Sequence, residues 1–299
     1  MNAPRQDIIC IGSVLWDNIG RSPREMREGN DMPGRISRIP GGVAMNIAMT
    51  LSRFGLRPVL LSALGTDAEG DELIRAARAM GMVTGHLHRM DEMPTDSYMA
   101  IEGANGLIAA IADAHSLEAA GDAILAPLLS GALGSPEAPY AGTVALDGNL
   151  TDALLAQIAA SPAFARADLR IAPASPGKAE RLRAIIGHQG ATLYVNLEEA
   201  ALISGAEGLR TAQDGAEALL AAGARRVIVT HGGHAACDAG LGEEHAAFPP
   251  KVTAKRITGA GDTFMAAHIA AEVQGKTRPE AIEFAQKTAA EYVAGESNG

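Results

Sequence analysis

The 299-residue sequence has few aromatic residues and no surplus of positive charge. Phe, Trp and Tyr make up only 3% of it, whereas apolar residues make up 47%, which favours a tightly packed, helix-rich core over disorder. The net charge is −10 and no run of Lys or Arg occurs, so a nucleic-acid-binding surface is disfavoured. A small ligand or a metal-chelated nucleotide fits this composition better.

Cysteine is also scarce, and long apolar runs are absent. Cys10 and Cys237 both lie in apolar, strand-like segments without a Cys-x-x-Cys pair, so we expect buried thiols. No apolar run reaches the roughly 18 residues of a membrane span. The first residues, Met1–Asp7, lack a basic region followed by a long apolar run. These absences predict a soluble, cytoplasmic protein without a membrane partner.

Several common catalytic signatures are missing as well. There is no Gly-x-Gly-x-x-Gly after the first apolar segment and no P-loop motif. The Gly-x-Ser-x-Gly motif and the protein-kinase signature set are absent too. The 8 histidines contain no His-x₃-His pair, so we interpret them as solvated surface residues. Dinucleotide binding and the usual P-loop chemistry are therefore disfavoured.

Strand-like and helix-like segments alternate along most of the chain. Asp7–Val14 is a continuous apolar run, as a strand covered on both faces requires. Gly42–Phe54 carries an apolar stripe at helical spacing. Further strands are expected at Pro58–Leu64, Thr143–Leu146, Leu169–Ala172, Thr192–Asn196 and Arg226–Thr230, and further helices at Glu69–Met80, Thr151–Ala160, Pro176–Ile186, Leu197–Ser204 and from Ala260 onward. This repetition predicts one α/β domain over residues 1–299, with a mainly parallel sheet between two layers of helices.

One region breaks the alternation. Ser97–Glu102 and Leu107–Asp113 are strand-like runs joined through Asn105-Gly106, a strong hairpin signal, and Arg35–Ile39 is a third candidate strand. We expect a small antiparallel β lid formed by about residues 34–40 and 95–113. The alternatives are a decorative hairpin, a lid over a site, or a surface through which two copies pair.

The segment Thr258-Gly259-Ala260-Gly261-Asp262 opens an Ala-rich helical stretch. Glycine lets the backbone approach a ligand closely, and the first N–H groups of a helix have no internal partner, so the segment predicts an anion hole. Asp262 beside it could take a proton from a substrate hydroxyl, and we expect the first helical turn to keep its pKa low. The alternative is a tight turn with a favourable first-turn acid.

Other polar residues are expected at the carboxyl ends of the strands, where open parallel sheets bind ligands. Asp17 could accept two sugar hydroxyls, or it is a plain loop acid. Gly41-Gly42 with Asn46 would allow close approach of a polyhydroxylated ligand, or it only starts a helix. Asn196 and Glu199 suit a hydrated Mg²⁺ ion, although capping by Asn196 explains the pair equally well.

Asp67 lies in the segment Gly65–Gly70, between a strand and a helix. A helix cap is the favoured interpretation of this acid, ahead of a catalytic role.

Together these motifs resemble the ribokinase-like (PfkB) family of carbohydrate and nucleoside kinases over nearly the whole chain. Gly41-Gly42 with Asn46, followed by Gly65, Asp67 and Gly70, matches the N-terminal signature of that family, and Thr258–Asp262 matches its C-terminal signature. The resemblance implies a ribokinase-like three-layer α/β/α fold with a small β lid. It also implies ATP and Mg²⁺ as cofactors and phosphoryl transfer to an alcohol.

The resemblance assigns a role to each matching position. It implies that Asp262 is the catalytic base beside an anion hole of Gly259, Ala260 and Gly261. The implied substrate contacts are Asp17, Gly41, Gly42 and Asn46. The implied ATP contacts are Asn196, Thr230, Gly232, Gly259 and Gly261, with Glu199 acting on Mg²⁺ through water. The C-terminal helix around Ala285–Ala289 is expected to wall the adenine pocket.

The lid hairpin resembles that of pseudouridine kinases. This implies the 5′-hydroxyl of pseudouridine as phosphoacceptor, with Thr95 and Tyr98 facing the nucleobase or ribose, and a homodimer formed through the lid. A kinase of ribose, fructose or another nucleoside is the runner-up. A non-catalytic nucleotide- or sugar-binding regulator is the alternative from another class.

Arg256 marks a departure from the family pattern. Many members carry an acid, linked to a monovalent cation, shortly before the Gly-Ala-Gly-Asp element, whereas this chain has Lys255-Arg256 there. Because an arginine cannot ligate K⁺, we expect no activation by monovalent cations in the usual manner.

Overall fold

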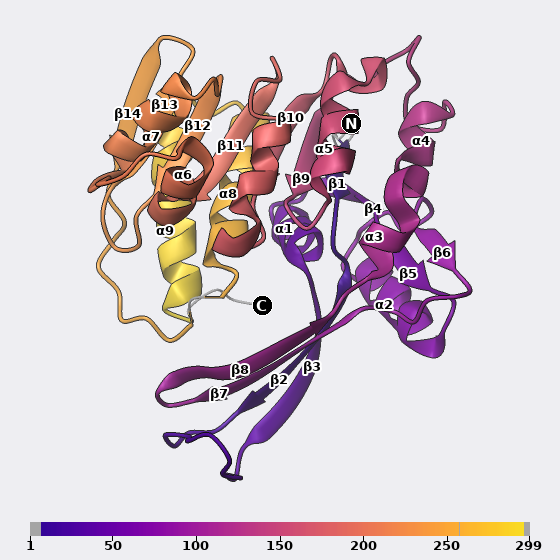
Figure 1. The fold of residues 1–299 in the computed structure, drawn as a ribbon, viewed down its shortest axis with the longest axis vertical. Helices are drawn as coiled ribbons and strands as arrows, with labels where there is room; N and C mark the ends of the chain where they lie inside the picture. Colours follow the sequence, from indigo (N-terminus) through magenta and orange to yellow (C-terminus); the bar gives the residue numbers. More distant parts are fainter. Residues whose placement is uncertain (1–6, 257, 296–299) are drawn as a thin grey trace.

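The central sheet has eight strands and lies between two layers of helices (Figure 1). The computed structural model describes residues 7–256 and 258–295. Most of the N-terminal segment Met1–Asp7, which lacks the pattern of a leader, therefore lies outside the described residues. The strands, in spatial order, are β14 (Glu243–Ala247), β13 (Ala236–Gly240), β12 (Arg226–Thr230), β11 (Ala191–Asn196), β10 (Asp168–Ala172), β9 (Thr143–Asp147), β1 (Asp7–Ile11) and β4 (Arg57–Leu61). Pairing is parallel from β12 to β4 and antiparallel only at β13 and β14. The predicted mainly parallel sheet is confirmed.

Two apolar clusters form the core, one on each face of this sheet. One face is covered by α1 (Val43–Arg53), α2 (Ala68–Ala79), α8 (Ala260–Val273) and α9 (Arg278–Val293). The other is covered by α3 (Ser116–Ala120), η1 (Gly121–Leu125), α4 (Ala126–Leu129), α5 (Asp152–Ala160), η2 (Pro162–Phe164), η3 (Pro176–Ala184), α6 (Leu197–Ser204) and α7 (Ala212–Ala221). Because both faces are covered, the parallel strands are apolar on both sides.

The lid is a second sheet that projects from the main body (Figure 1). Its strand order is β3 (Arg35–Gly41), β2 (Leu15–Arg21), β7 (Ser97–Gly103) and β8 (Gly106–Asp113). Strand β2 is missing from the sequence prediction because its polar residues and glycine break the apolar pattern. It pairs antiparallel with β3 but parallel with β7, so the expectation of a purely antiparallel lid is wrong at that pairing. Nearby, β5 (Ala63–Gly65) pairs with β6 (His88–Met90).

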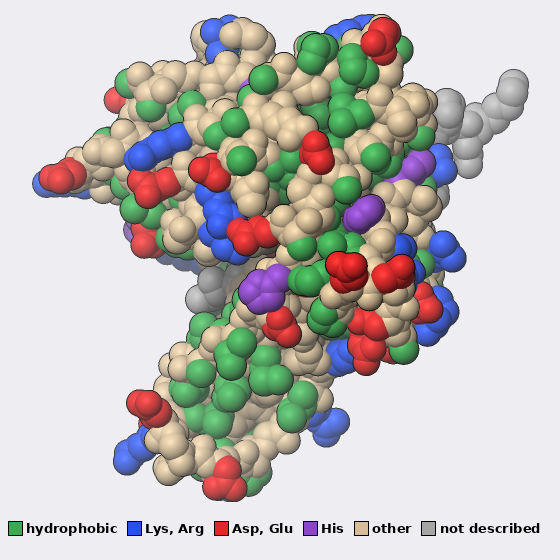
Figure 2. All heavy atoms as spheres, turned by 45° about the vertical axis from the view of Figure 1, so that its right-hand side comes forward, with side chains coloured by type: hydrophobic (Ala, Val, Ile, Leu, Met, Phe, Trp, Pro, Cys, Tyr) green, Lys and Arg blue, Asp and Glu red, His purple; other side chains and the backbone are tan. Residues whose placement is uncertain are grey.

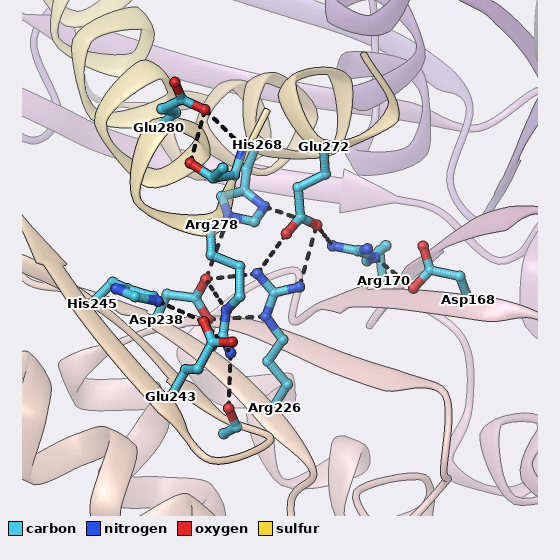
Figure 3. A network of polar contacts seen from close by, with 12 residues as sticks. Asp168, Arg170, Arg226, Asp238, Glu243, His245, His268, Glu272, Arg278 and Glu280 are labelled. Atoms are coloured by element: carbon cyan, nitrogen blue, oxygen red, sulfur yellow. Dashed lines mark hydrogen bonds and ion pairs between the residues drawn. The ribbon is translucent and has the colours of Figure 1, made fainter. Parts of the chain in front are cut away.

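An ionic network ties the far end of α8 to the sheet (Figure 3). Arg226 of β12 contacts Glu272 of α8 at 2.7 Å and Asp238 of β13 at 2.6 Å. Arg170 of β10 also contacts Glu272, and Arg278 of α9 contacts Asp238, both at 2.5 Å. Buried charges are tolerated when they are paired in this way, and such pairs fix relative positions. The network therefore anchors α8, the helix whose first turn contains Asp262.

His268 lies inside this network, so the surface interpretation is wrong for this histidine. Its ring is fully buried and its Nδ1 atom is 3.0 Å from the Tyr194 hydroxyl. Burial lowers the pKa of His268 to about 4, so the ring is neutral near pH 7. His268, Asp238 and Glu272 are close enough together to suggest a metal site. However, both carboxylates are already paired with arginines, so we interpret the group as a structural network.

Two other expectations can be compared with the fold. Cys10 and Cys237 are free and buried, as predicted, and burial raises the pKa of each thiol to about 12. Such thiols are inert at neutral pH. Within the described residues, no helix combines the length and the apolar character that crossing a bilayer requires.

Candidate active site

Asp262 lies in the first turn of α8 and faces the first turn of α1. The Asn46 side-chain amide donates a hydrogen bond of 2.9 Å to Asp262 Oδ2. Helix α1 starts after Gly42, whose φ of 92° is a conformation that favours glycine. A Cβ atom at Gly42 would lie 2.5 Å from the Ser13 carbonyl oxygen. Glycine at this position therefore allows the close approach that aims Asn46 at Asp262.

The expected low pKa of Asp262 is wrong. Burial raises the pKa of Asp262 to about 7, and the charges of Asp147, Asp17 and Glu199 raise it further, whereas the hydrogen bond from Asn46 lowers it. The helix terminus was expected to dominate, but desolvation and neighbouring carboxylates outweigh it. Asp262 keeps part of its surface accessible. The geometry thus presents a carboxylate that titrates near neutral pH, as a general base requires.

The turn that precedes Asp262 is open on one side. We call residues Gly259–Gly261 the glycine turn. Gly259 has a φ of 84° and is the N-cap of α8, followed by Ala260 and Gly261 in the first turn. No heavy atom lies within 4 Å of the position that a Cβ atom on Gly261 would occupy. Because the first N–H groups of a helix lack partners within the helix, a helix start next to open space is suited to receive an anion.

Asp17 lies within lid strand β2, not in a loop. Its carboxylate fills the space beside Gly41, where a Cβ atom would lie 2.0 Å from Asp17 Oδ2. Tyr98 is its register partner on β7, so the two side chains share a face of the lid. Burial raises the pKa of Asp17 to about 6, and its charge in turn contributes to the raised pKa of Tyr98. Asp17, Gly41, Tyr98, Asn46 and Asp262 are thus brought into one region.

Thr95 contacts Asp67 through both its hydroxyl and its backbone. Its hydroxyl donates to Asp67 Oδ1 at 2.5 Å, and its backbone N–H donates to Asp67 Oδ2 at 2.7 Å. Asp67 also caps α2 by accepting from the Gly70 N–H, in agreement with the capping interpretation. The Thr95 hydroxyl therefore donates its only proton to Asp67, and toward a ligand it could act only as a hydrogen-bond acceptor.

Ser13 and Asp147, which belong to a buried polar cluster at the ends of β1 and β9, were not identified as part of a site from the sequence. Asp147 is fully buried and accepts hydrogen bonds from the backbone N–H groups of Ser13 at 2.8 Å and Asn149 at 2.7 Å. The Ser13 hydroxyl accepts from the Val43 N–H at 2.9 Å and so joins the cluster to α1. The only sequence signal was an acid directly after an apolar strand. The charge of Asp147 contributes to the raised pKa of Asp262, and the Ser13 hydroxyl holds the start of α1.

Asn196 and Glu199 form a reciprocal capping box at the start of α6. Asn196 Oδ1 accepts from the Glu199 N–H at 2.9 Å, and Glu199 Oε2 accepts from the Asn196 N–H at 2.8 Å. The capping alternative is thus realised. Burial raises the pKa of Glu199 to about 7, and its charge acts on Asp262. Glu199 therefore caps a helix while its charge also contributes to the raised pKa of Asp262.

A hollow of about 620 Å³ lies beside Asn196. Thr230 and Gly232, at the end of β12, line it together with Asn196, whose register partner on β12 is Thr230. Asp262 and Asp17 are not among its lining residues, so the hollow is separate from the space around these two acids. Its size is within the range of small-ligand sites. The residues expected to contact ATP thus fall into two groups, one at this hollow and one at the glycine turn.

The chain matches known proteins over almost its full length. The pfkB family carbohydrate kinase profile matches residues 5–298. The pseudouridine kinase of Escherichia coli K12 is 29% identical over 286 residues, covering 93% of this chain and 88% of that enzyme. The ribokinase of Haemophilus influenzae is 25% identical, with coverages of 96% and 92%. A solved carbohydrate kinase from Agrobacterium tumefaciens superposes with a TM-score of 0.78 at 27% identity, covering 95% of this chain and 90% of its own.

Proposed function

Since this chain belongs to the pfkB family of carbohydrate kinases, which transfer phosphoryl groups to alcohols, we propose that it transfers the γ-phosphoryl group of ATP to a ribosyl hydroxyl. The preferred acceptor in this proposal is the 5′-hydroxyl of pseudouridine. The alternative acceptors are another nucleoside or a free sugar such as ribose or fructose. The catalytic unit is one kinase domain with its β lid.

The observation that carries the proposal is the contact between Asp262 and Asn46 beside the open glycine turn. Asp262 has a pKa near neutrality and retains an accessible surface, so it can accept the proton of an acceptor hydroxyl. The N–H groups of the glycine turn stabilise the charge of the transferring phosphoryl group. Positioning and charge stabilisation are the main requirements of this reaction.

The acceptor side of the proposed site is formed by the lid and the start of α1. Asp17 accepts two neighbouring sugar hydroxyls, and Gly41 and Gly42 allow the sugar ring to approach. Asn46 contacts both the sugar and the catalytic base, Asp262. Tyr98 is the register partner of Asp17, and in this proposal it contacts the nucleobase or ribose. The E. coli pseudouridine kinase match supports this acceptor class, and the ribokinase match keeps a free sugar as the alternative.

The nucleotide side of the proposed site extends from the glycine turn to the hollow beside Asn196. Thr230 and Gly232 would contact the phosphates there. Burial, and after it the charges of Asp147, Asp17 and Glu199, raise the pKa of Asp262, and this gathering of carboxylates fits a site that receives a divalent cation. Glu199 would hold Mg²⁺ through water, and Mg²⁺ would neutralise phosphate charge.

The lid also supports a proposal for assembly. Hydrophobic side chains are exposed on it (Figure 2), and the large ones are Ile36, Ile39, Met99, Ile101, Leu107 and Ile111. Met99 pairs with Ile111, and both lie with Ile36 and Ile101 on the face opposite Asp17 and Tyr98. Ile39 and Leu107 pair with Asp17 and Glu102, so they lie on the same face as Asp17. An exposed apolar face of this kind is typical of a protein interface. We propose that two copies pair through this face, while the other face serves the acceptor.

A substrate panel tests the proposed function. ADP release would be measured with MgATP and, in turn, pseudouridine, uridine, ribose and fructose. Pseudouridine is expected to give the highest kcat/KM, because the lid contacts select the nucleobase. A higher kcat/KM with ribose or fructose would assign a free-sugar acceptor. Binding of nucleotide and acceptor without turnover of any compound would instead favour the non-catalytic regulator.

A further inference from the structure

The loop between β14 and α8 is fastened to the C-terminal end of α9. The N–H groups of Lys255 and Arg256 both donate to the Val293 carbonyl, at 2.9 and 3.2 Å. The Arg256 Nε atom donates to the Tyr292 carbonyl at 2.8 Å. The last carbonyls of a helix lack internal partners, and a positive charge is favourable at that end. Arg256 therefore caps α9 with both its backbone and its guanidinium group.

The same arginine stacks on an aromatic ring. The guanidinium carbon of Arg256 lies 3.7 Å from the centre of the Tyr292 ring, which is the geometry of a cation–π contact. Arg256 thus contacts Tyr292 through both the ring and the carbonyl. A lysine could keep the charge, but it could not keep the flat stacked contact together with the directed hydrogen bond.

Tyr292 carries this contact to the glycine turn. Its hydroxyl donates to the Thr258 carbonyl at 2.8 Å, one residue before Gly259. A Cβ atom on Gly259 would lie 2.6 Å from the same hydroxyl oxygen, so the turn rests directly on Tyr292. Gly259 adopts a left-handed conformation in which its carbonyl accepts the first helical hydrogen bond, from Thr263. The orientation of the first N–H groups of α8 therefore depends on where Tyr292 holds Thr258 and Gly259.

We propose that Arg256 and Tyr292 form a clamp that positions the glycine turn for phosphoryl transfer. Both are positioning residues that act through the backbone of Thr258 and Gly259. This inference rests on the proposed function, because the glycine turn must receive the transferring phosphoryl group. The clamp ties the turn to α9, whereas the network of Arg226 and Glu272 anchors the other end of α8 to the sheet.

Donors aimed at the charge of a transition state contribute most when they are held in place beforehand. Loosening the clamp should therefore weaken the contacts to the γ-phosphoryl group. The contacts to the rest of the nucleotide and to the acceptor should stay unchanged. The signature is a lower kcat with an unchanged acceptor KM. A second signature is weaker binding of a non-hydrolysable ATP analogue with unchanged binding of ADP.

Three variants separate the parts of the clamp. Tyr292→Phe keeps the ring under Arg256 and removes only the hydroxyl that contacts Thr258. Arg256→Gln removes the stacked charge, and Arg256→Lys restores the charge alone. We expect kcat to fall about tenfold in Tyr292→Phe and Arg256→Gln, with an intermediate value in Arg256→Lys. The ratio of analogue to ADP dissociation constants should rise about fivefold in the first two variants, while acceptor KM stays within about twofold.

Lys276→Met is the matched control. The Lys276 ammonium nitrogen lies 5.7 Å from the centre of the Phe284 ring, a second cation–π pair, which joins the loop before α9 to that helix. This variant should leave kcat and the dissociation-constant ratio unchanged. Wild-type values in Tyr292→Phe and Arg256→Gln would overturn the clamp, as would equal losses of ADP and analogue binding with a lower Tm. Failure of the wild-type protein to bind either nucleotide would instead overturn the proposed function.

Discussion

Asp262 sets the expected pH dependence of the reaction. Its pKa is raised to about 7, first by burial and then by neighbouring carboxylates, so the unprotonated base forms only as the pH rises. At saturating MgATP and acceptor, kcat should increase from about pH 6 to about pH 8 and then level off. Asn46→Leu removes the hydrogen bond that lowers this pKa, so its profile should shift to higher pH. The same pH profile in both proteins would contradict this role of Asn46.

Asp17 is expected to act mainly in acceptor binding. Asp17→Ala should raise the acceptor KM about tenfold, because one charge-assisted hydrogen bond to the acceptor is lost. Its effect on kcat should be smaller. Because the pKa of Asp17 is raised to about 6 by burial, acceptor binding to wild type should also weaken below that pH. Asp113→Ala, at the exposed edge of the same lid, serves as the control. An unchanged KM in Asp17→Ala would remove Asp17 from the acceptor site.

The sequence indicated the residues that meet at the site better than it indicated their environment. Short motifs carry Asp262, Gly42 and Asn46, so these positions could be predicted from local pattern and family resemblance. The raised pKa of Asp262 could not, because it depends first on burial in the folded protein and then on Asp147, Asp17 and Glu199, which are distant in sequence. The same holds for Tyr292, whose contact with Thr258 bridges 34 residues.

At the scale of elements, the loop before α8 determines the expected response to monovalent cations. Arg256 occupies this loop, where it caps α9 and stacks on Tyr292. A guanidinium group cannot ligate K⁺ and would repel it. Adding KCl at constant ionic strength, with tetramethylammonium chloride as the balancing salt, should leave kcat unchanged. A large rise in rate with KCl would show that a cation binds despite Arg256.

The regular elements could be predicted where one physical signal dominates. Continuous apolar runs identified the strands covered on both faces, such as β1 and β12, and an apolar stripe identified α1. Strand β2 could not be found, because it is stabilised by its lid neighbours β3 and β7 more than by its own sequence. The buried network at the end of α8 was missed for a related reason, since its charges come from separate strands and helices.

At the scale of the whole molecule, the apolar lid face predicts self-association. Met99→Lys combined with Ile111→Lys places two like charges on a cross-strand pair of that face. Like charges in an interface are unfavourable, so these changes should convert a dimer into a monomer. Sedimentation velocity would measure the change.

The control for this prediction is Leu241→Lys, which changes a residue that is also exposed but lies in the turn between β13 and β14. It should leave the sedimentation coefficient of wild type unchanged. A wild-type protein that sediments as a monomer at all concentrations would contradict pairing through the lid.

The central claim is that Asp262 is the base that activates the acceptor hydroxyl, and Asp262→Asn tests it most directly. This change keeps the size of the side chain and removes its ability to take a proton. We expect kcat to fall about a thousandfold or more, while the dissociation constant of an ATP analogue stays within about twofold of wild type. The variant should be at least as stable as wild type at about pH 8, because the raised pKa means that the buried charge opposes folding at high pH. Turnover close to that of wild type in this folded, nucleotide-binding variant would contradict the account.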